Sequence, residues 1–305
     1  ALGESLVKFG YVFVSFELRG CGVSFGINDS FGSPEHCQDV IAVTEWISRQ
    51  NWYNGKIGML GCSNRAYIQL CTAAYNPQKI NAVTPVVAVT DFYYQNYPNG
   101  VSAAPNWRYK KYDHMISKEE FLKNVLPVDS DPEGDMAYQA FTGFHFENNK
   151  DFFETLIIPN LQRDSKHPNY KGEQVFLTLP PFGKVDTFFS REDVKQHQFI
   201  GQLESGTLGQ LAHFIDFGGS ASLGPWTHFG ACVCQSDFPN GSINVVEAYQ
   251  KWYDSALKNI SNGFCETPAI SYYMFHADPG KEWRFSESWP PENEVRTRLY
   301  FDNKP

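Results

Sequence analysis

A serine stands at the centre of the stretch GKIGMLGCSNRAYIQL, which runs from Gly55 to Leu70. The apolar run Ile57–Leu60 predicts a short strand, and a helical pattern begins at Ala66, just after Ser63. A strand, a sharp turn and a helix make up the Gly-x-Ser-x-Gly elbow, which holds a nucleophilic serine. Helix N-caps also favour serine, so capping is the ordinary alternative for Ser63. Gly61, two residues earlier, favours the nucleophile.

A serine hydroxyl becomes an effective nucleophile only beside a base that is itself oriented by an acid. In α/β-hydrolases the chain order is serine, acid, histidine, and each lies in a loop after a strand. Asp186 lies in PPFGKVDTFF, after a predicted strand at Gln174–Leu179, and His228 lies in SLGPWTHFG, after another apolar segment. A solvated turn aspartate and a packed loop histidine are the alternatives. The shared order favours a triad of Ser63, Asp186 and His228.

Composition argues against several other classes of function. The net charge is −9 and the Lys and Arg residues are scattered, so a nucleic-acid partner is not expected. No apolar run reaches the roughly 18 residues of a membrane span, and no signal peptide is visible, which slightly favours a cytoplasmic location. The seven cysteines show no spacing typical of a disulfide framework or a zinc site. Cys232-Val-Cys234 is expected in a buried strand or loop, so no metal is predicted there, and the triad chemistry needs no cofactor.

The N-terminal third alternates helical and strand patterns in the α/β manner. Helices are expected at Leu2–Phe9, Pro34–Gln50, Tyr67–Tyr75, Ser117–Val125, Phe152–Leu161 and Val245–Asn259. Strands are expected at Tyr11–Phe16, Lys56–Leu60, Ile80–Val89, Gln174–Leu179, near His213–Phe217 and after Gly263. These patterns predict an α/β-hydrolase core at 1–91 and 173–262 and a helical cap insertion at 92–172. Residues 263–305 are expected to form a β-rich connection to a C-terminal domain that is largely absent.

Together the motifs resemble those of the CocE/NonD hydrolases, which include cocaine esterase, α-amino acid ester hydrolases and X-prolyl dipeptidyl-peptidase relatives. The segments that carry this resemblance are GYVFVSFELRGCGVSFG, VTEWISRQNWYNGKIGMLGCS, NAVTPVVAVTDFY, GKVDTFF, LGPWTH and DPGKEWRFSESWPP. GKVDTFF is similar to the family's Gly-Trp-Tyr-Asp-x-Phe around the acid, and LGPWTH to its Gly-Pro-Trp-x-His. The resemblance implies an α/β-hydrolase fold with a mostly parallel sheet, a helical cap and the start of a jelly-roll. It also implies Ser63 as nucleophile, Asp186 as acid and His228 as base.

The family's elbow is Gly-x-Ser-Tyr-x-Gly, so its second glycine falls at Ala66 and Arg65 stands at a variable position. The aromatic residue after the serine is replaced by Asn64, whose main-chain N–H is expected to serve the oxyanion hole. The resemblance implies a second donor, a tyrosine hydroxyl, from a loop upstream of this chain. The expectation is therefore that the chain is part of a longer polypeptide, extended at both ends. Expressed alone, it is expected to be poorly soluble and weakly active.

The predicted function is that of a serine hydrolase that cleaves an ester or amide acyl bond through an acyl-enzyme intermediate. An X-prolyl dipeptidyl-peptidase is one alternative, with acidic residues between Glu119 and Asp135 as a clamp for a free amino terminus, although such residues are usually solvated. An inactive binding module that kept the fold is the other alternative. The expected partner is a small ester, amide or short peptide, with no nucleic acid and no membrane, and a homo-oligomer is left open.

Overall fold

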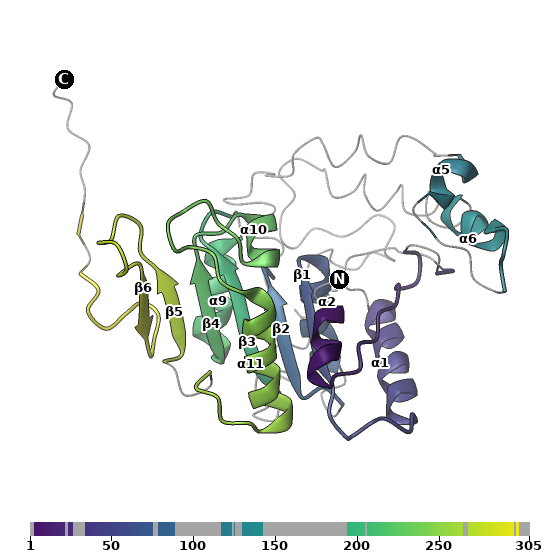
Figure 1. Ribbon diagram of the computed structural model, residues 1–305, viewed down its shortest axis with the longest axis horizontal. Coiled ribbons are helices and arrows are strands. Elements are labelled where there is room, and N and C mark those ends of the chain that lie inside the picture. The colour runs from purple at the N-terminus through teal and green to yellow at the C-terminus, as the bar shows by residue number, and fades with distance from the viewer. Residues whose placement is uncertain are drawn as a thin grey trace, which may run out of the picture.

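The computed structural model describes residues 3–21, 24–26, 34–75, 79–88, 117–123, 125, 130–142, 194–204, 206–264, 268–295 and 297–298. A six-stranded sheet in the order β1-β2-β3-β4-β5-β6 forms its centre (Figure 1). The strands are β1 (Gly58–Cys62), β2 (Ala82–Val86), β3 (Lys195–Gly201), β4 (Ser220–Gly224), β5 (Ile270–Tyr273) and β6 (Trp283–Ser286). Strands β1 to β5 pair in parallel and β6 pairs antiparallel with β5, so the predicted mostly parallel sheet is confirmed.

Helices pack on both faces of this sheet. One face carries the 3-10 helix η1 (Gly3–Phe9), α10 (His228–Val233) and α11 (Val245–Lys258). The other face carries α1 (Pro34–Ser48), α2 (Asn64–Tyr75) and α9 (Thr207–Phe217). Successive strand residues point to opposite faces, so in β3 Phe199 packs toward α11 and Ile200 toward α9. Burial of each such side chain stabilises the fold by about 1.5–3 kcal/mol.

Several predicted elements are present within a few residues of their expected bounds. The helix expected at Val245–Asn259 is α11, whose N-cap Asn244 accepts a hydrogen bond from the N–H of Glu247. The helix expected at Ser117–Val125 is the shorter α5 (Lys118–Leu122), with Ser117 as N-cap. It packs on α6 (Asp135–Gln139) through Phe121 and Tyr138, at the upper right of Figure 1. The predicted elements at 152–161 and 174–179 lie outside the described residues.

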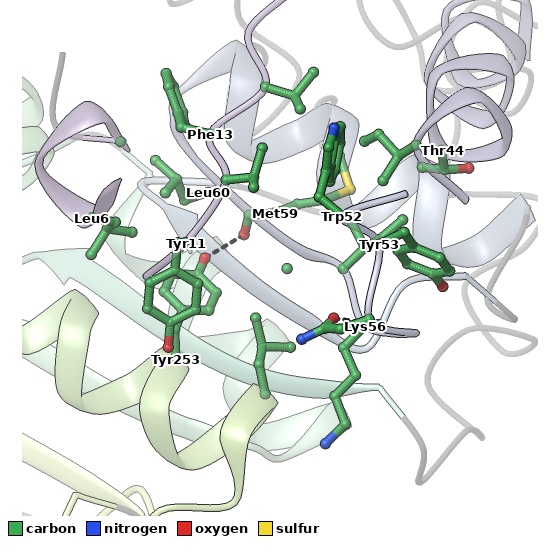
Figure 2. A pocket seen from close by; sticks show the side chains of 18 of the residues that line it. Leu6, Tyr11, Phe13, Thr44, Trp52, Tyr53, Lys56, Met59, Leu60 and Tyr253 are labelled. Atoms are coloured by element: carbon green, nitrogen blue, oxygen red, sulfur yellow. Dashed lines mark hydrogen bonds between the residues drawn. The ribbon is translucent and has the colours of Figure 1, made fainter. Parts of the chain in front are cut away.

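The segment Tyr11–Phe16, expected to be a buried strand, forms no strand. The Tyr11 hydroxyl donates to Asp254 Oδ1 at 2.7 Å, and Lys258 Nζ lies 3.9 Å from the centre of the Tyr11 ring, so α11 holds this segment. A cavity of about 280 Å³ lies between it and β1 (Figure 2). A strand requires a ladder partner at about 4.8 Å, and none of the described strands pairs with this segment.

The prediction of a strand near His213–Phe217 is also wrong, because these residues form the last part of helix α9. Gln210, Leu211, His213 and Phe214 are buried, a spacing typical of one helical face. The two strands that flank α9, β3 and β4, were not predicted. Further along, β5 pairs with β4, so residues 270–273 continue the central sheet.

Candidate active site

Ser63 lies between the last residue of β1 and the first residue of α2. Its φ angle is +60°, a left-handed conformation that is uncommon for residues other than glycine. The N–H of Ser63 donates to the carbonyl of Val86 at 2.9 Å, and its carbonyl accepts from the N–H groups of Ala66 and Tyr67. The serine thus occupies a tight strand-to-helix turn whose backbone is held from both sides. This is the geometry of a nucleophile elbow.

The glycine before the elbow has a steric reason. A Cβ atom built on Gly61 would lie 2.5 Å from the Cβ of Arg65, because the first turn of α2 folds back over β1. Ala66, at the position of the family's second glycine, has no exposed surface and packs with Leu70 and Val83. Glycine is therefore required at position 61, whereas the methyl group of Ala66 fits at the position of the family's second glycine.

A buried glutamine supports the same turn. The side chain of Gln69 is 1% exposed, and its Nε2 donates to the carbonyls of Gly61 at 3.3 Å and Arg65 at 3.1 Å. Its Oε1 accepts from the N–H of Thr84 at 2.9 Å. Gln69 therefore connects α2 to β1 and β2 through the residues on either side of Ser63 in the chain. Asn64 begins α2, so its main-chain N–H has no acceptor within the helix and is available to a ligand.

The segment Gly224–His228 is an anchored loop that ends in a histidine. The side chain of Trp226 has no exposed surface, and its Nε1 donates to the carbonyl of Gly241 at 2.8 Å. A Cβ atom on Gly224 would lie 2.3 Å from the Trp226 ring, which explains the glycine. Thr227 caps α10 by accepting from the N–H of Gly230 at 3.2 Å. His228 is thereby placed as the first residue of α10.

The carboxylate beside His228 is that of Glu204. His228 Nδ1 lies 3.1 Å from Glu204 Oε2, and the glutamate side chain is only 3% exposed. The other carboxylate oxygen accepts from Gln210 Nε2 at 2.9 Å and from the N–H of Gly206 at 3.2 Å. A buried carboxylate at Nδ1 places the proton on that nitrogen and leaves Nε2 as the basic atom. The pair therefore has the chemistry of a base and its orienting acid.

The two loops that carry these side chains run together. The N–H of Gln202 donates to the carbonyl of Gly224 at 2.9 Å, and the N–H of Leu203 donates to the carbonyl of Trp226 at 3.0 Å. A Cβ atom on Gly201 would lie 2.7 Å from the carbonyl oxygen of Trp226, so glycine permits this approach. The main chain therefore fixes the distance between Glu204 and His228.

Asp186, the acid expected from the sequence, lies outside the described residues. Glu204 was missed because β3, KQHQFIG, contains the polar residues Gln196, His197 and Gln198, which are nevertheless buried. One signal was available in the sequence. Gly201-Gln202-Leu203-Glu204 has the same glycine-to-acid spacing as the Gly-Trp-Tyr-Asp pattern. It also precedes His228 in the required order.

Cys62 and Cys232 form a disulfide, with their Cα atoms 5.4 Å apart and 170 residues between them in sequence. The spacing of the seven cysteines gave no indication of this disulfide. Sequence spacing could not reveal a pairing between residues so far apart. Cys62 immediately precedes Ser63, and Cys232 lies one turn of α10 after His228. The disulfide therefore joins the serine elbow to the histidine helix.

Ser63, Glu204 and His228 follow β1, β3 and β4, so all three lie at the carboxyl-end edge of the parallel sheet (Figure 1). Ligands bind at this edge in α/β proteins. Within the described ranges, no group of three His, Cys, Asp or Glu residues is arranged to hold a metal ion. None of the helices in the described part of the chain is long and apolar enough to cross a membrane.

Comparison with known proteins shows which families this chain is similar to. Residues 2–142 match the family model of the X-Pro dipeptidyl-peptidases (S15 family). A putative serine esterase of Mycobacterium bovis is 22% identical over 97% of this chain and 51% of its own length. A putative Xaa-Pro dipeptidyl-peptidase of Bacillus cereus is 24% identical over 99% of this chain and 48% of its own length. The chain thus spans about half the length of these curated relatives.

Two solved structures share the fold. A CocE/NonD family hydrolase from Staphylococcus aureus superposes with a TM-score of 0.61 at 19% identity, over 93% of this chain and 43% of that one. An α-amino acid ester hydrolase superposes with a TM-score of 0.58 at 16% identity, over 95% of this chain and 49% of that one. The resemblance inferred from the motifs is confirmed: the chain has the α/β-hydrolase fold of the CocE/NonD hydrolases, and residues 2–142 are related in sequence to the X-Pro dipeptidyl-peptidase (S15) family.

Proposed function

We propose that this protein is a serine hydrolase that cleaves an ester or amide acyl bond, with Ser63, His228 and Glu204 as its triad. The observation that carries the proposal is that one disulfide joins the turn of Ser63 to the helix of His228. A serine in a left-handed elbow follows Cys62, and a histidine on a buried carboxylate precedes Cys232. The names of the relatives, serine esterases and Xaa-Pro dipeptidyl-peptidases, agree with a hydrolase.

In the proposed reaction, Ser63 Oγ attacks the carbonyl carbon of the substrate while His228 Nε2 takes the serine proton. Glu204 stabilises the imidazolium that forms, without itself taking the proton. The N–H of Asn64 donates to the developing oxyanion. His228 then gives its proton to the leaving alkoxide or amine, and the acyl group stays on Ser63. Water, deprotonated by His228, releases the acid and restores the serine.

Glu204 takes the role that the motif GKVDTFF indicates for Asp186. The choice rests on its 3.1 Å contact with His228 Nδ1 and on the two hydrogen bonds that fix its second oxygen. Asp186 stays a prediction from the motif GKVDTFF alone. An aspartate and a glutamate can both serve as the acid that orients a histidine. Mutation of each carboxylate in turn therefore shows which of the two acts on His228.

Labelling with a fluorophosphonate probe tests the proposal directly, because the probe phosphonylates only a serine that a base activates. The wild-type protein should be labelled on the peptide that contains Ser63, and Ser63→Ala should not be labelled. Ser48→Ala is the matched control, since Ser48 ends α1, far from Ser63 in sequence, and its hydroxyl donates to the carbonyl of Glu45 at 2.7 Å. If the folded wild-type protein is not labelled, the fold belongs to an inactive binding module instead.

Hydrolysis of p-nitrophenyl acetate and of glycyl-prolyl-p-nitroanilide distinguishes the two enzyme alternatives. Turnover of the ester alone supports an esterase, whereas efficient turnover of the anilide supports an X-prolyl dipeptidyl-peptidase. The second substrate requires a group that binds its free amino terminus. In the described part of the cap, the side chain of Asp135 is already engaged by Lys118 at 2.6 Å. Asp131 accepts from the N–H groups of Met136 and Ala137, so two of the acids proposed for this clamp already have partners within residues 117–142.

A further inference from the structure

The disulfide between Cys62 and Cys232 joins residues that are otherwise held by different parts of the sheet. We propose that it is a positioning device for the site, which keeps the helix of His228 beside the elbow of Ser63, so that turnover depends on the oxidised state of this pair. The inference rests on the proposed function, because it assigns a role to the link between the two proposed catalytic side chains.

The topology creates the need for such a link. Ser63 follows β1, whereas His228 follows β4, and β2 and β3 lie between these two strands. Three steps of about 4.8 Å between neighbouring strands separate the strand ends by roughly 14 Å. The loop after β4 must therefore reach back across β3 and β2 before its histidine can meet the serine. No strand pairing holds it there, because β1 and β4 are not neighbours.

The helix that makes this reach is short. α10 has six residues, fewer than an isolated helix needs for stability in water. On its inner side Ala231 is fully buried in the cluster that contains Phe199 and Trp226. Its first residue, His228, is 36% exposed in its side chain. Apolar packing therefore holds the middle of α10, and Glu204 with the Trp226 loop holds its first residue toward β3 and β4. These contacts leave a restraint toward β1 still to be supplied.

The disulfide supplies that restraint at the correct place. Cys232 follows His228 by four residues, so both lie on the same face of α10, and Cys232 Sγ is 3.2 Å from the carbonyl oxygen of His228. At the other end, Cys62 is bonded through one peptide unit to Ser63. The covalent path from serine to histidine thus runs through one cystine and one helical turn. Glu204 fixes the rotation of the imidazole, and the disulfide fixes the distance of its backbone from the elbow.

Reduction breaks this path in a balanced reaction. A dithiol such as dithiothreitol transfers two electrons and two protons, the S–S bond becomes two S–H groups, and the dithiol closes to a cyclic disulfide. We expect substrate binding to change little, whereas attack by Ser63 slows. A displacement of about 1 Å between reacting groups costs on the order of a hundredfold in rate. The predicted effect is a fall in kcat of about 10- to 100-fold with KM nearly unchanged.

The test compares oxidised protein, dithiothreitol-treated protein and the double variant C62A/C232A. The readouts are kcat and KM for p-nitrophenyl acetate and the pH dependence of the fluorophosphonate labelling rate. All rates are divided by the concentration of folded protein, measured by circular dichroism, so that partial unfolding does not count as slow chemistry. Cys21→Ser is the control, because Cys21 is a thiol outside this disulfide. It should match the wild type before and after reduction.

The proposal predicts that reduced wild-type protein and the double variant share the same lowered kcat, and that dithiothreitol has no further effect on the variant. Equal kcat in the oxidised and reduced wild type would overturn it. So would alkylation of both Cys62 and Cys232 in the native, unreduced protein. If the oxidised protein is not labelled at all, the proposed function fails instead. Normal labelling that is insensitive to reduction rejects the positioning role and leaves the hydrolase intact.

Discussion

Replacement of Glu204 by glutamine removes one charge and keeps the shape of the side chain. At 3.1 Å, and with an effective dielectric constant of about 20, a carboxylate stabilises an imidazolium by about 5 kcal/mol. Each 1.4 kcal/mol corresponds to about a factor of ten in rate, so the upper estimate is about a 10⁴-fold loss of kcat. Water screens the partly exposed imidazole, and we therefore expect a loss of about 10³- to 10⁴-fold.

Asp186→Asn is the decisive companion variant, because the motif resemblance favours Asp186 as the acid. Both variants should be compared in kcat for p-nitrophenyl acetate, with thermal unfolding followed by circular dichroism to show that each is folded. Glu287→Gln changes an exposed carboxylate and serves as the control. A Glu204→Gln protein within threefold of the wild type, beside an Asp186→Asn protein that is nearly inactive, would refute the assignment made from the structure.

Two further predictions concern the surroundings of the site. Gln210→Ala removes a hydrogen bond to the Glu204 carboxylate that is worth about 1.5–3 kcal/mol, so kcat should fall about 10- to 100-fold, and an unchanged kcat would show that Glu204 is held without it. Burial lowers the pKa of His197 and His213 to about 3, so between pH 6.5 and 5 the unfolded chain binds protons that the native protein does not. The free energy of unfolding should therefore fall as the pH is lowered, with a slope that approaches about 1.4 kcal/mol per pH unit for each histidine near pH 5, and His197→Phe should reduce that slope in urea titrations.

Local features of the site were predictable from the sequence because their causes are local. The elbow needs a small residue at Gly61 to clear Arg65, and the histidine loop needs Gly224 to clear Trp226. Both requirements lie within a few residues of the functional side chain, so they appear as short motifs. Helix α11 was predictable for the same reason, since its cap and its apolar face lie within one continuous segment.

Features that depend on distant partners were not predictable in this way. Tyr11–Phe16 has the composition of a strand, but a strand is defined by a ladder partner, and a cavity lies between this segment and β1. β3 is the reverse case, because its composition is polar and yet it forms a buried strand. His197 is buried in it because its ring nitrogens meet the hydroxyls of Ser220 and Ser222 on the neighbouring strand. A polar strand satisfied by its neighbour has no apolar pattern, and Glu204 was missed along with it.

The two halves of the proposed triad are held together in different ways. Glu204 and His228 follow adjacent strands, and two main-chain hydrogen bonds between their loops keep them in register. Such bonds form wherever β3 and β4 pair, so this half of the site is a consequence of the sheet. Ser63 belongs to a strand that is not a neighbour of β4, and no ladder can align it with the histidine. The approach of Ser63 to His228 that proton transfer requires is therefore one that the sheet does not specify, and the Cys62–Cys232 disulfide joins the two segments that carry these residues.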